Sequence, residues 1–118
     1  MTAVSKGFAT GIASNGFTAL GSGNSPIKVK VLTGTTGAAE GSDASVAHGL
    51  TGAKIIGIMA KIEYNTNTGV LPGFVAAIVA EYEYGVSHDS TTIYVKLHPT
   101  NSANLTSKPF TLVVLYVE

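Results

Sequence analysis

The 118-residue sequence contains no cysteine, no arginine and no tryptophan. Without cysteine the chain can form neither disulfides nor thiolate metal sites, and it has no cysteine nucleophile. Arginine is the preferred side chain for bidentate contacts with phosphates, and the seven lysines are balanced by seven carboxylates, so nucleic-acid binding is disfavoured. The lack of tryptophan argues against a small carbohydrate-binding module, because no such ring is available to stack on a sugar.

Charged residues are also scarce. They make up 12% of the sequence, against a typical share of about 25%, while 45% of the residues are hydrophobic. No apolar stretch approaches the roughly 20 residues that span a bilayer, and the N-terminus lacks the pattern of a signal peptide, so we expect no membrane insertion. A small protein with so few charges has more apolar surface than its own core can hold. We therefore expect an obligate oligomer that buries part of this surface between subunits.

The composition changes near residue 25. Residues 1–25 are small and polar, with isolated apolar side chains, and such a segment cannot build a core of its own. One interpretation is an extended attachment arm that docks on a neighbouring protein and buries Phe8 and Phe17. The other is a mobile leader whose aromatic residues are incidental. Residues 26–118 are long enough for one folded domain with a sizeable core.

The longest apolar run lies between Ala47 and Tyr64. Alternate residues along it are apolar, which predicts a strand with one face in a core. We interpret this strand as the centre of an antiparallel sheet, with the later segments as its partners. The residues predicted to face the core are Ile56, Ile58, Ala60, Ile62 and Tyr64.

Other segments also have the pattern of strands. Near the start of the domain Ile27, Val29 and Val31 alternate with Lys28 and Lys30, which predicts that the aliphatic side chains face inward. Residues 74–80 form a short apolar run that favours a buried strand. Residues 82–86 and 91–97 flank a polar turn and predict a hairpin, with Ile93, Val95 and Leu97 inward.

The last strand is predicted from residue 109 to the C-terminus, and it is apolar on both faces. A strand of this kind is buried on both sides, so we expect one face in the core and the other, with Val113, Leu115 and Val117, in a subunit interface. In total the sequence indicates five or six strands about ten residues apart and no helical periodicity. The predicted fold is all-β, an antiparallel, jelly-roll-like β-sandwich with an extended N-terminal arm.

Residues 45–118 resemble a small domain found in structural proteins of tailed-phage virions, notably fibre and spike-like proteins. The resemblance implies a trimeric β-sandwich mounted on a virion, and it names no catalytic residues. The variable N-terminal region lies outside the match, as expected for an attachment segment. The segments that carry the resemblance are His48-Gly49-Leu50, Tyr82 with Tyr84, His88-Asp89-Ser90, Thr92-Ile93-Tyr94-Val95, Ser102-Ala103-Asn104-Leu105, Lys108-Pro109-Phe110 and Tyr116.

The three histidines, His48, His88 and His98, lie in three different turns, and no short ligand spacing brings two of them together. We therefore expect no metal site within one chain, although a three-fold axis could gather three copies of one histidine. His48 is expected to fix its own turn through hydrogen bonds. Asp89 is expected to cap its turn through its side chain.

Glu81 and Glu83 are predicted on one strand face, with Cβ atoms about 7 Å apart. That separation suits a pair of hydrolytic carboxylates, but no other feature supports hydrolysis. Pairing with Lys61 or Lys96 on neighbouring strands is the favoured expectation. No nucleophile motif or phosphate-binding motif is present, so we expect no enzyme activity and no cofactor.

The expected function is that of a non-enzymatic virion component, assembled in the host cytoplasm as a homotrimer. One hypothesis is a fibre that contacts a receptor, in which the arm binds other virion proteins and the loops meet a glycan or protein of the host surface. The other is a capsid decoration protein whose trimers cement the shell. The residues expected in host-facing loops are Asn65, Asn67, His88, Asp89 and Asn101.

Overall fold

The structure is a computed structural model that describes residues 26–72 and 80–118. The expected arm, with Phe8 and Phe17, lies outside the described residues, as does most of the strand expected at 74–80. The described residues form strands that alternate with turns and two short 3-10 helices. The elements are β1 (Lys28–Thr35), β2 (Asp43–Ala47), η1 (Gly52–Lys54), β3 (Ile55–Asn65), β4 (Thr68–Val70), β5 (Tyr84–His88), β6 (Thr92–Leu97), η2 (Ala103–Leu105) and β7 (Pro109–Tyr116).

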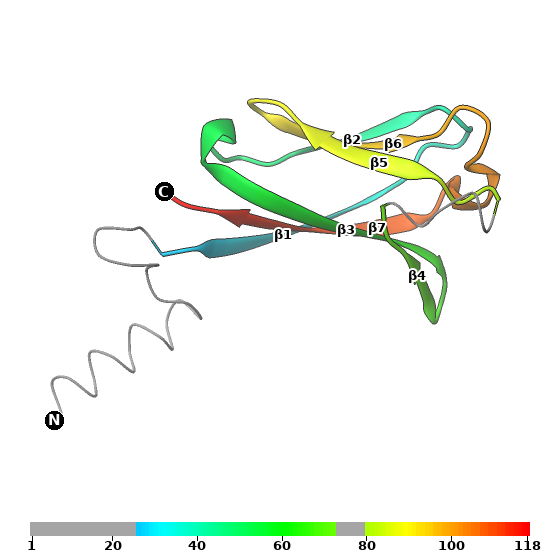
Figure 1. The fold of residues 1–118 in the computed structure, drawn as a ribbon, viewed down its shortest axis with the longest axis horizontal. Coiled ribbons are helices and arrows are strands. Elements are labelled where there is room, and N and C mark those ends of the chain that lie inside the picture. Colours follow the sequence, from blue (N-terminus) through cyan, green and yellow to red (C-terminus); the bar gives the residue numbers. More distant parts are fainter. Residues whose placement is uncertain (1–25, 73–79) are drawn as a thin grey trace, which may run out of the picture.

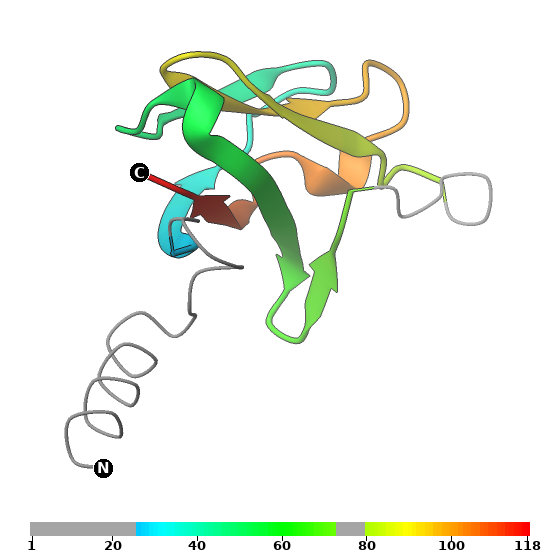
Figure 2. The ribbon, with the colours of Figure 1, turned by 60° about the vertical axis from the view of Figure 1, so that its left-hand side comes forward.

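Two antiparallel sheets face each other and confirm the predicted all-β sandwich (Figure 1). The four-stranded sheet has the order β1-β7-β3-β4, and the three-stranded sheet has the order β2-β6-β5. The pair β2–β6 is nested within the pair β1–β7, which gives the jelly-roll-like wrapping that was expected. The hairpin of β3 and β4 extends beyond the two layers (Figure 2).

The core lies between the sheets. Ile93, Val95 and Leu97 of β6 are buried, which confirms their predicted inward direction. Leu112 and Val114 of β7 are fully buried opposite them. Each such side chain contributes roughly 1.5–3 kcal/mol through removal from water. The other buried hydrophobic residues within 26–72 and 80–118 are Ala60, Ile62, Val70, Tyr84, Leu105 and Phe110.

The central strand predicted from the sequence corresponds to β3, which has β7 and β4 on its two sides. Its partners differ from the prediction, because β5 and β6 belong to the other sheet. Ile58, Ala60 and Ile62 face the core as predicted. The prediction for Ile56 is wrong: its side chain is 54% exposed. The register against β7 shifts between Ile55 and Gly57, and this bulge turns Ile56 out of the alternation.

The predicted orientation of β1 is also wrong. Val29 and Val31 are exposed, while Lys28 and Lys30 lie on the side that faces the sandwich. Leu32 has the same parity as the lysines and packs against the core, and this one residue decides which face of the strand is inward. The lysines extend their alkyl chains along the rim of the core and keep their ammonium groups in polar surroundings.

The hairpin of β5 and β6 confirms the prediction for residues 82–97, except that the strand begins at Tyr84 rather than at residue 82. Tyr84 is buried, and its hydroxyl donates a hydrogen bond to the carbonyl of Val70 at 2.6 Å. This bond connects β5 in one sheet with β4 in the other. Burial raises the pKa of the Tyr84 hydroxyl. β4 was not predicted, because it has only three residues.

Candidate functional site

The outward side of the four-stranded sheet carries two rows of apolar residues. In one row Val31 of β1 and Met59 of β3 lie on either side of Val113 of β7. In the next row Val29 lies opposite Leu115. Residues opposite one another on neighbouring strands point to the same side of a sheet, so these side chains form one surface. We call this surface the outer face and define it by Val29, Val31, Met59, Val113 and Leu115.

Three side chains of the outer face are largely exposed, while Val113 and Leu115 between them are partly buried. Val31 is 59% exposed, Met59 57% and Val29 46%, and Ile56, in the bulge of β3, is 54% exposed. These four residues are most of the large exposed hydrophobic residues that the described part of the chain contains. An exposed apolar side chain is ordinary when it stands alone, whereas adjacent rows of them mark a surface that binds another surface. The five residues of the outer face supply no group for acid-base or nucleophilic chemistry, so what it can do is associate.

Two residues predicted for a subunit interface, Val113 and Leu115, lie on the outer face. The third, Val117, follows the end of β7, and its amide donates a hydrogen bond to the carbonyl of Lys54 at 3.0 Å. Sequence reasoning missed Val29, Val31, Ile56 and Met59. One signal was available: Met59 is apolar, although it shares the parity of the exposed Lys61 and Glu63. Leu71, after β4, is the remaining large exposed hydrophobic residue in the described part of the chain.

A pair of turns lies at the end of the sandwich where β5 meets β6. His48 is fully buried, accepts a hydrogen bond from the amide of Leu50 at 3.0 Å through Nδ1, and donates from Nε2 to the carbonyl of Asp89 at 3.1 Å. Gly49, between His48 and Leu50, has φ +66°, a conformation that favours glycine. These contacts confirm that His48 fixes its turn, and they show that it also holds the neighbouring hairpin turn.

The side chain of Asp89 caps the β5–β6 turn, as predicted. Its Oδ1 accepts the amides of Thr91 at 2.9 Å and Thr92 at 2.8 Å, and its Oδ2 accepts the hydroxyl of Tyr94 at 2.8 Å. The hydrogen bonds from the Thr91 amide, the Tyr94 hydroxyl and the Thr92 amide favour the ionised carboxylate and lower the pKa of Asp89 to about 2. The cap is therefore fully formed at neutral pH.

The histidines do not converge on a metal-binding arrangement. The rings of His48 and His88 are 6.1 Å apart and nearly perpendicular, while His98 follows the opposite end of β6. In residues 26–72 and 80–118 no group of three or more histidine or carboxylate side chains has the arrangement of a metal site.

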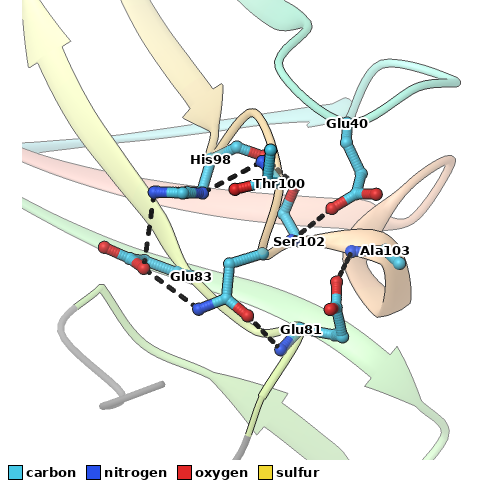
Figure 3. Close-up of polar contacts among 8 residues, drawn as sticks. Glu40, Glu81, Glu83, His98, Thr100, Ser102 and Ala103 are labelled. Atoms are coloured by element: carbon cyan, nitrogen blue, oxygen red, sulfur yellow. Dashed lines mark hydrogen bonds and ion pairs between the residues drawn. The ribbon is translucent and has the colours of Figure 1, made fainter. Parts of the chain in front are cut away.

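The connection between β6 and β7 is held by three carboxylates (Figure 3). Glu40 accepts the amide of Ser102 at 2.9 Å, and Glu81 accepts the amide of Ala103 at 3.1 Å. Glu83 accepts a hydrogen bond from the side-chain amide of Asn101 at 3.1 Å. Charge-assisted bonds to main-chain amides hold an irregular loop in one conformation. The arrangement is a clamp on residues 98–104.

The prediction that Glu81 and Glu83 lie on one face of a strand is wrong. Both residues precede β5, and Glu81 has φ +75°, which a strand residue does not adopt. The amide of Glu81 donates to the Asn101 side chain at 2.8 Å, and this bond holds the turn. The expected lysine partners also differ: Lys61 lies 3.7 Å from Glu63, and Lys96 lies 3.9 Å from Asp43.

The loops expected to face a host do not share one end of the sandwich. Asn65 and Asn67 form the β3–β4 turn, in which the Asn65 side chain accepts the amide of Asn67 at 3.1 Å. Asn101 lies in the loop that follows β6, whereas His88 and Asp89 lie at the turn that precedes it. A strand separates these last two places, so a single flat receptor would not contact both.

The described segments include no helix with the length and hydrophobicity of a membrane-spanning one. No protein family, curated protein or solved structure matches this chain.

Proposed function

We propose that this protein is a non-enzymatic structural subunit of a tailed-phage virion and that it associates as a homotrimer through the outer face. The observation that carries the proposal is the outer face, with its two rows of apolar side chains on β1, β7 and β3. The exposure of these side chains fits a sequence that contains few charged residues and many hydrophobic ones. The resemblance of residues 45–118 to phage fibre and spike-like domains supplies the virion and the three-fold symmetry.

The first form of the proposal is a fibre that contacts a receptor. Two loops expected to face the host, the β3–β4 turn and residues 98–104, belong to the half of the sandwich away from the His48 and Asp89 turns. The carboxylate clamp around Ser102 keeps one of them in a fixed shape. A fixed loop loses little conformational entropy when it binds, which favours recognition.

The second form is a capsid decoration protein, and one structural observation favours it. The predicted contact loops lie at both ends of β6, so the subunit presents different contacts at its two ends, as a protein that bridges neighbours in a shell requires. The short chain, without a repetitive shaft, also suits this form. Both forms use the outer face for association between copies.

The two forms differ in copy number and place. Imaging of labelled protein on purified particles would show a fibre at the tail, with tens of copies, or a decoration protein over the shell, with hundreds of copies. Absence of the protein from purified particles would refute both forms. Such a result would leave self-association as a separate question, which the mass of the purified protein answers.

A further inference from the structure

Among the described residues β5 is an edge strand of its sheet, with β6 on one side only. The amide of Asp89 donates to the carbonyl of Thr92 at 2.9 Å, and the amide of His98 donates to the carbonyl of Glu83 at 3.1 Å. Hydrogen-bonded pairs alternate along an antiparallel ladder, so every second residue from 83 to 89 bonds to β6. The residues between them point their main-chain groups to the free side, where no described residue pairs with them. These residues are Tyr84, Val86 and His88.

A cleft of about 290 Å³ lies along this free side, between β5 and β3. Residues 55–58 of β3 and 86–88 of β5 line it. β4 pairs with β3 only from Ile62 onward, so β4 does not cover this half of β3. Ile56, Ile58 and Val86 form the aliphatic part of the cleft, and Ser87 and His88 add polar groups. A strand added to β5 would point alternate side chains toward this cleft.

Two of the three other edges, β1 and β4, are less suited to accept a strand. β1 is an edge, but Lys28 and Lys30 point toward the sandwich from it, and inward-pointing charges oppose the addition of a strand. β4 has only three residues. β5 carries no lysine, aspartate or glutamate, and it contains Gly85, where an added Cβ would meet nothing within 4 Å.

The outer face alone is small for a stable assembly. Three strands of about eight residues cover roughly 14 Å by 26 Å, or about 370 Å². A stable interface usually buries about 800 Å² on each partner. A complex of copies that used the outer face alone would therefore need further contact surface.

Residues 7–13 have the pattern of a strand with unlike faces. On one parity Phe8 and Ile12 flank Thr10, and on the other parity every residue is glycine or alanine. A segment of this kind can point its bulky side chains into a cleft while its small side chains face away. Residues 14–25 then provide up to about 40 Å of chain before the domain begins, which is enough to reach an adjacent molecule.

We propose that residues 7–13 of one copy add as a strand to the free side of β5 in a neighbouring copy, with Phe8 and Ile12 in the cleft between β5 and β3. The proposal rests on the proposed function, in which copies of the chain associate. The added strand satisfies the free main-chain groups of β5 and covers the cleft. It also supplies contact area that the outer face lacks.

The sequence contains no cysteine, so introduced thiols report this contact directly. Ser87 is exposed on β5 and has the parity opposite to Tyr84 and Val86, and Ala9 is on the small parity of the arm, so both side chains should lie on the same, outward side of the extended sheet. Full-length Ala9→Cys carrying a C-terminal mass tag is mixed with untagged full-length Ser87→Cys under mild oxidation. The matched control is tagged Thr10→Cys, one residue along and on the opposite parity. We expect the mixed disulfide with Ala9→Cys to form at least about tenfold faster than with Thr10→Cys.

Adding Ile56→Asp to the Ser87→Cys chain should abolish this difference, because it places a charge in the cleft, and circular dichroism would show that the chain stays folded. Equal rates for the two arm positions would overturn the proposal. A second experiment places Ala9→Cys and Ser87→Cys in the same chain. The proposal would also be overturned if a disulfide formed only in this double variant and only within one chain. If the protein is an oligomer but forms no mixed disulfide, residues 7–13 do not bind β5, and association through the outer face is unaffected. If the protein is a monomer, the proposed function itself is refuted.

Discussion

The ammonium group of Lys30 donates a hydrogen bond to the main-chain carbonyl of His48 at 2.7 Å. This bond keeps the Lys30 side chain on the sandwich side of β1, at the rim of the core. Because side chains alternate along a strand, Val29 and Val31 then point away from the core. A strand whose lysines face inward thus supplies valines to the outer face, and it is the reversed orientation of β1 that makes this face continuous across three strands.

A lysine placed on the outer face should separate the subunits. In Val31→Lys an ammonium group would lie beside Val113 and would have to be desolvated in the assembly, so we expect the dissociation constant of the oligomer to rise at least tenfold, or about 1.4 kcal/mol. Sedimentation over a range of concentrations measures this change. The matched control is Ser45→Lys, on the exposed side of β2 in the other sheet. Equal dissociation in both variants would show that added charge, rather than its place, is responsible.

Loss of the Asp89 cap should lower the melting temperature in a pH-dependent way. The pKa of Asp89 falls from 3.8 to about 2 on folding, so its contribution is complete above about pH 5 and is lost as the pH falls toward 2. We expect Asp89→Ala to melt below the wild type at pH 6, and the two melting curves to approach each other near pH 2. Asp43→Ala, which removes only a 3.9 Å ion pair on the surface, is the control. A gap that stays constant down to pH 2 would contradict the assignment.

The hydroxyl of Thr36 connects the segment after β1 to the segment before β7. This buried residue donates to the carbonyl of Leu105 at 2.6 Å and accepts the amide of Lys108 at 2.8 Å. Thr36→Val keeps the shape but leaves both groups without this partner, so we expect a loss of about 1–3 kcal/mol in unfolding free energy. Urea denaturation measures it, with the exposed neighbour in Thr35→Val as the control. If both variants lose the same unfolding free energy, the loss comes from the change in strand propensity and not from the hydrogen bonds of Thr36.

His48 should matter more to stability than any other histidine. His48→Ala would remove a fully buried ring and both of its hydrogen bonds, so we expect a loss of at least about 2 kcal/mol. His88→Ala, at an exposed position two strands away in sequence, should cost less than about 1 kcal/mol. Thermal unfolding of the two variants compares them. A similar loss for both would mean that His48 does not hold the turns together.

Part of the fold could be predicted because hydrophobic alternation specifies strands and polar clusters specify turns. The β5–β6 hairpin has both signals, and the short polar side chain of Asp89 has few roles open to it other than its cap. β7 was predictable in the same way, because its sustained run of aliphatic and β-branched residues indicates a strand. Each of these inferences rests on local sequence alone.

The direction of β1 could not be predicted because alternation gives the period of a strand but not which face is inward. Leu32 settles the matter only once its contacts with the core are known. Ile56 illustrates a second limit: the bulge between Ile55 and Gly57 changes the parity of one residue, and no local signal marks it. The apolar rows depend on pairing among β1, β7 and β3, which are far apart in sequence, so they emerge only from the register.

The most direct test of the account is the molar mass of the purified full-length protein, measured by sedimentation equilibrium or mass photometry at several concentrations. If the outer face binds copies of the same chain, the wild type will have three times the mass of one chain, and Val31→Lys will shift it toward the monomer. A wild-type protein that remains a single chain at every concentration, with no tendency to associate, would contradict the central claim.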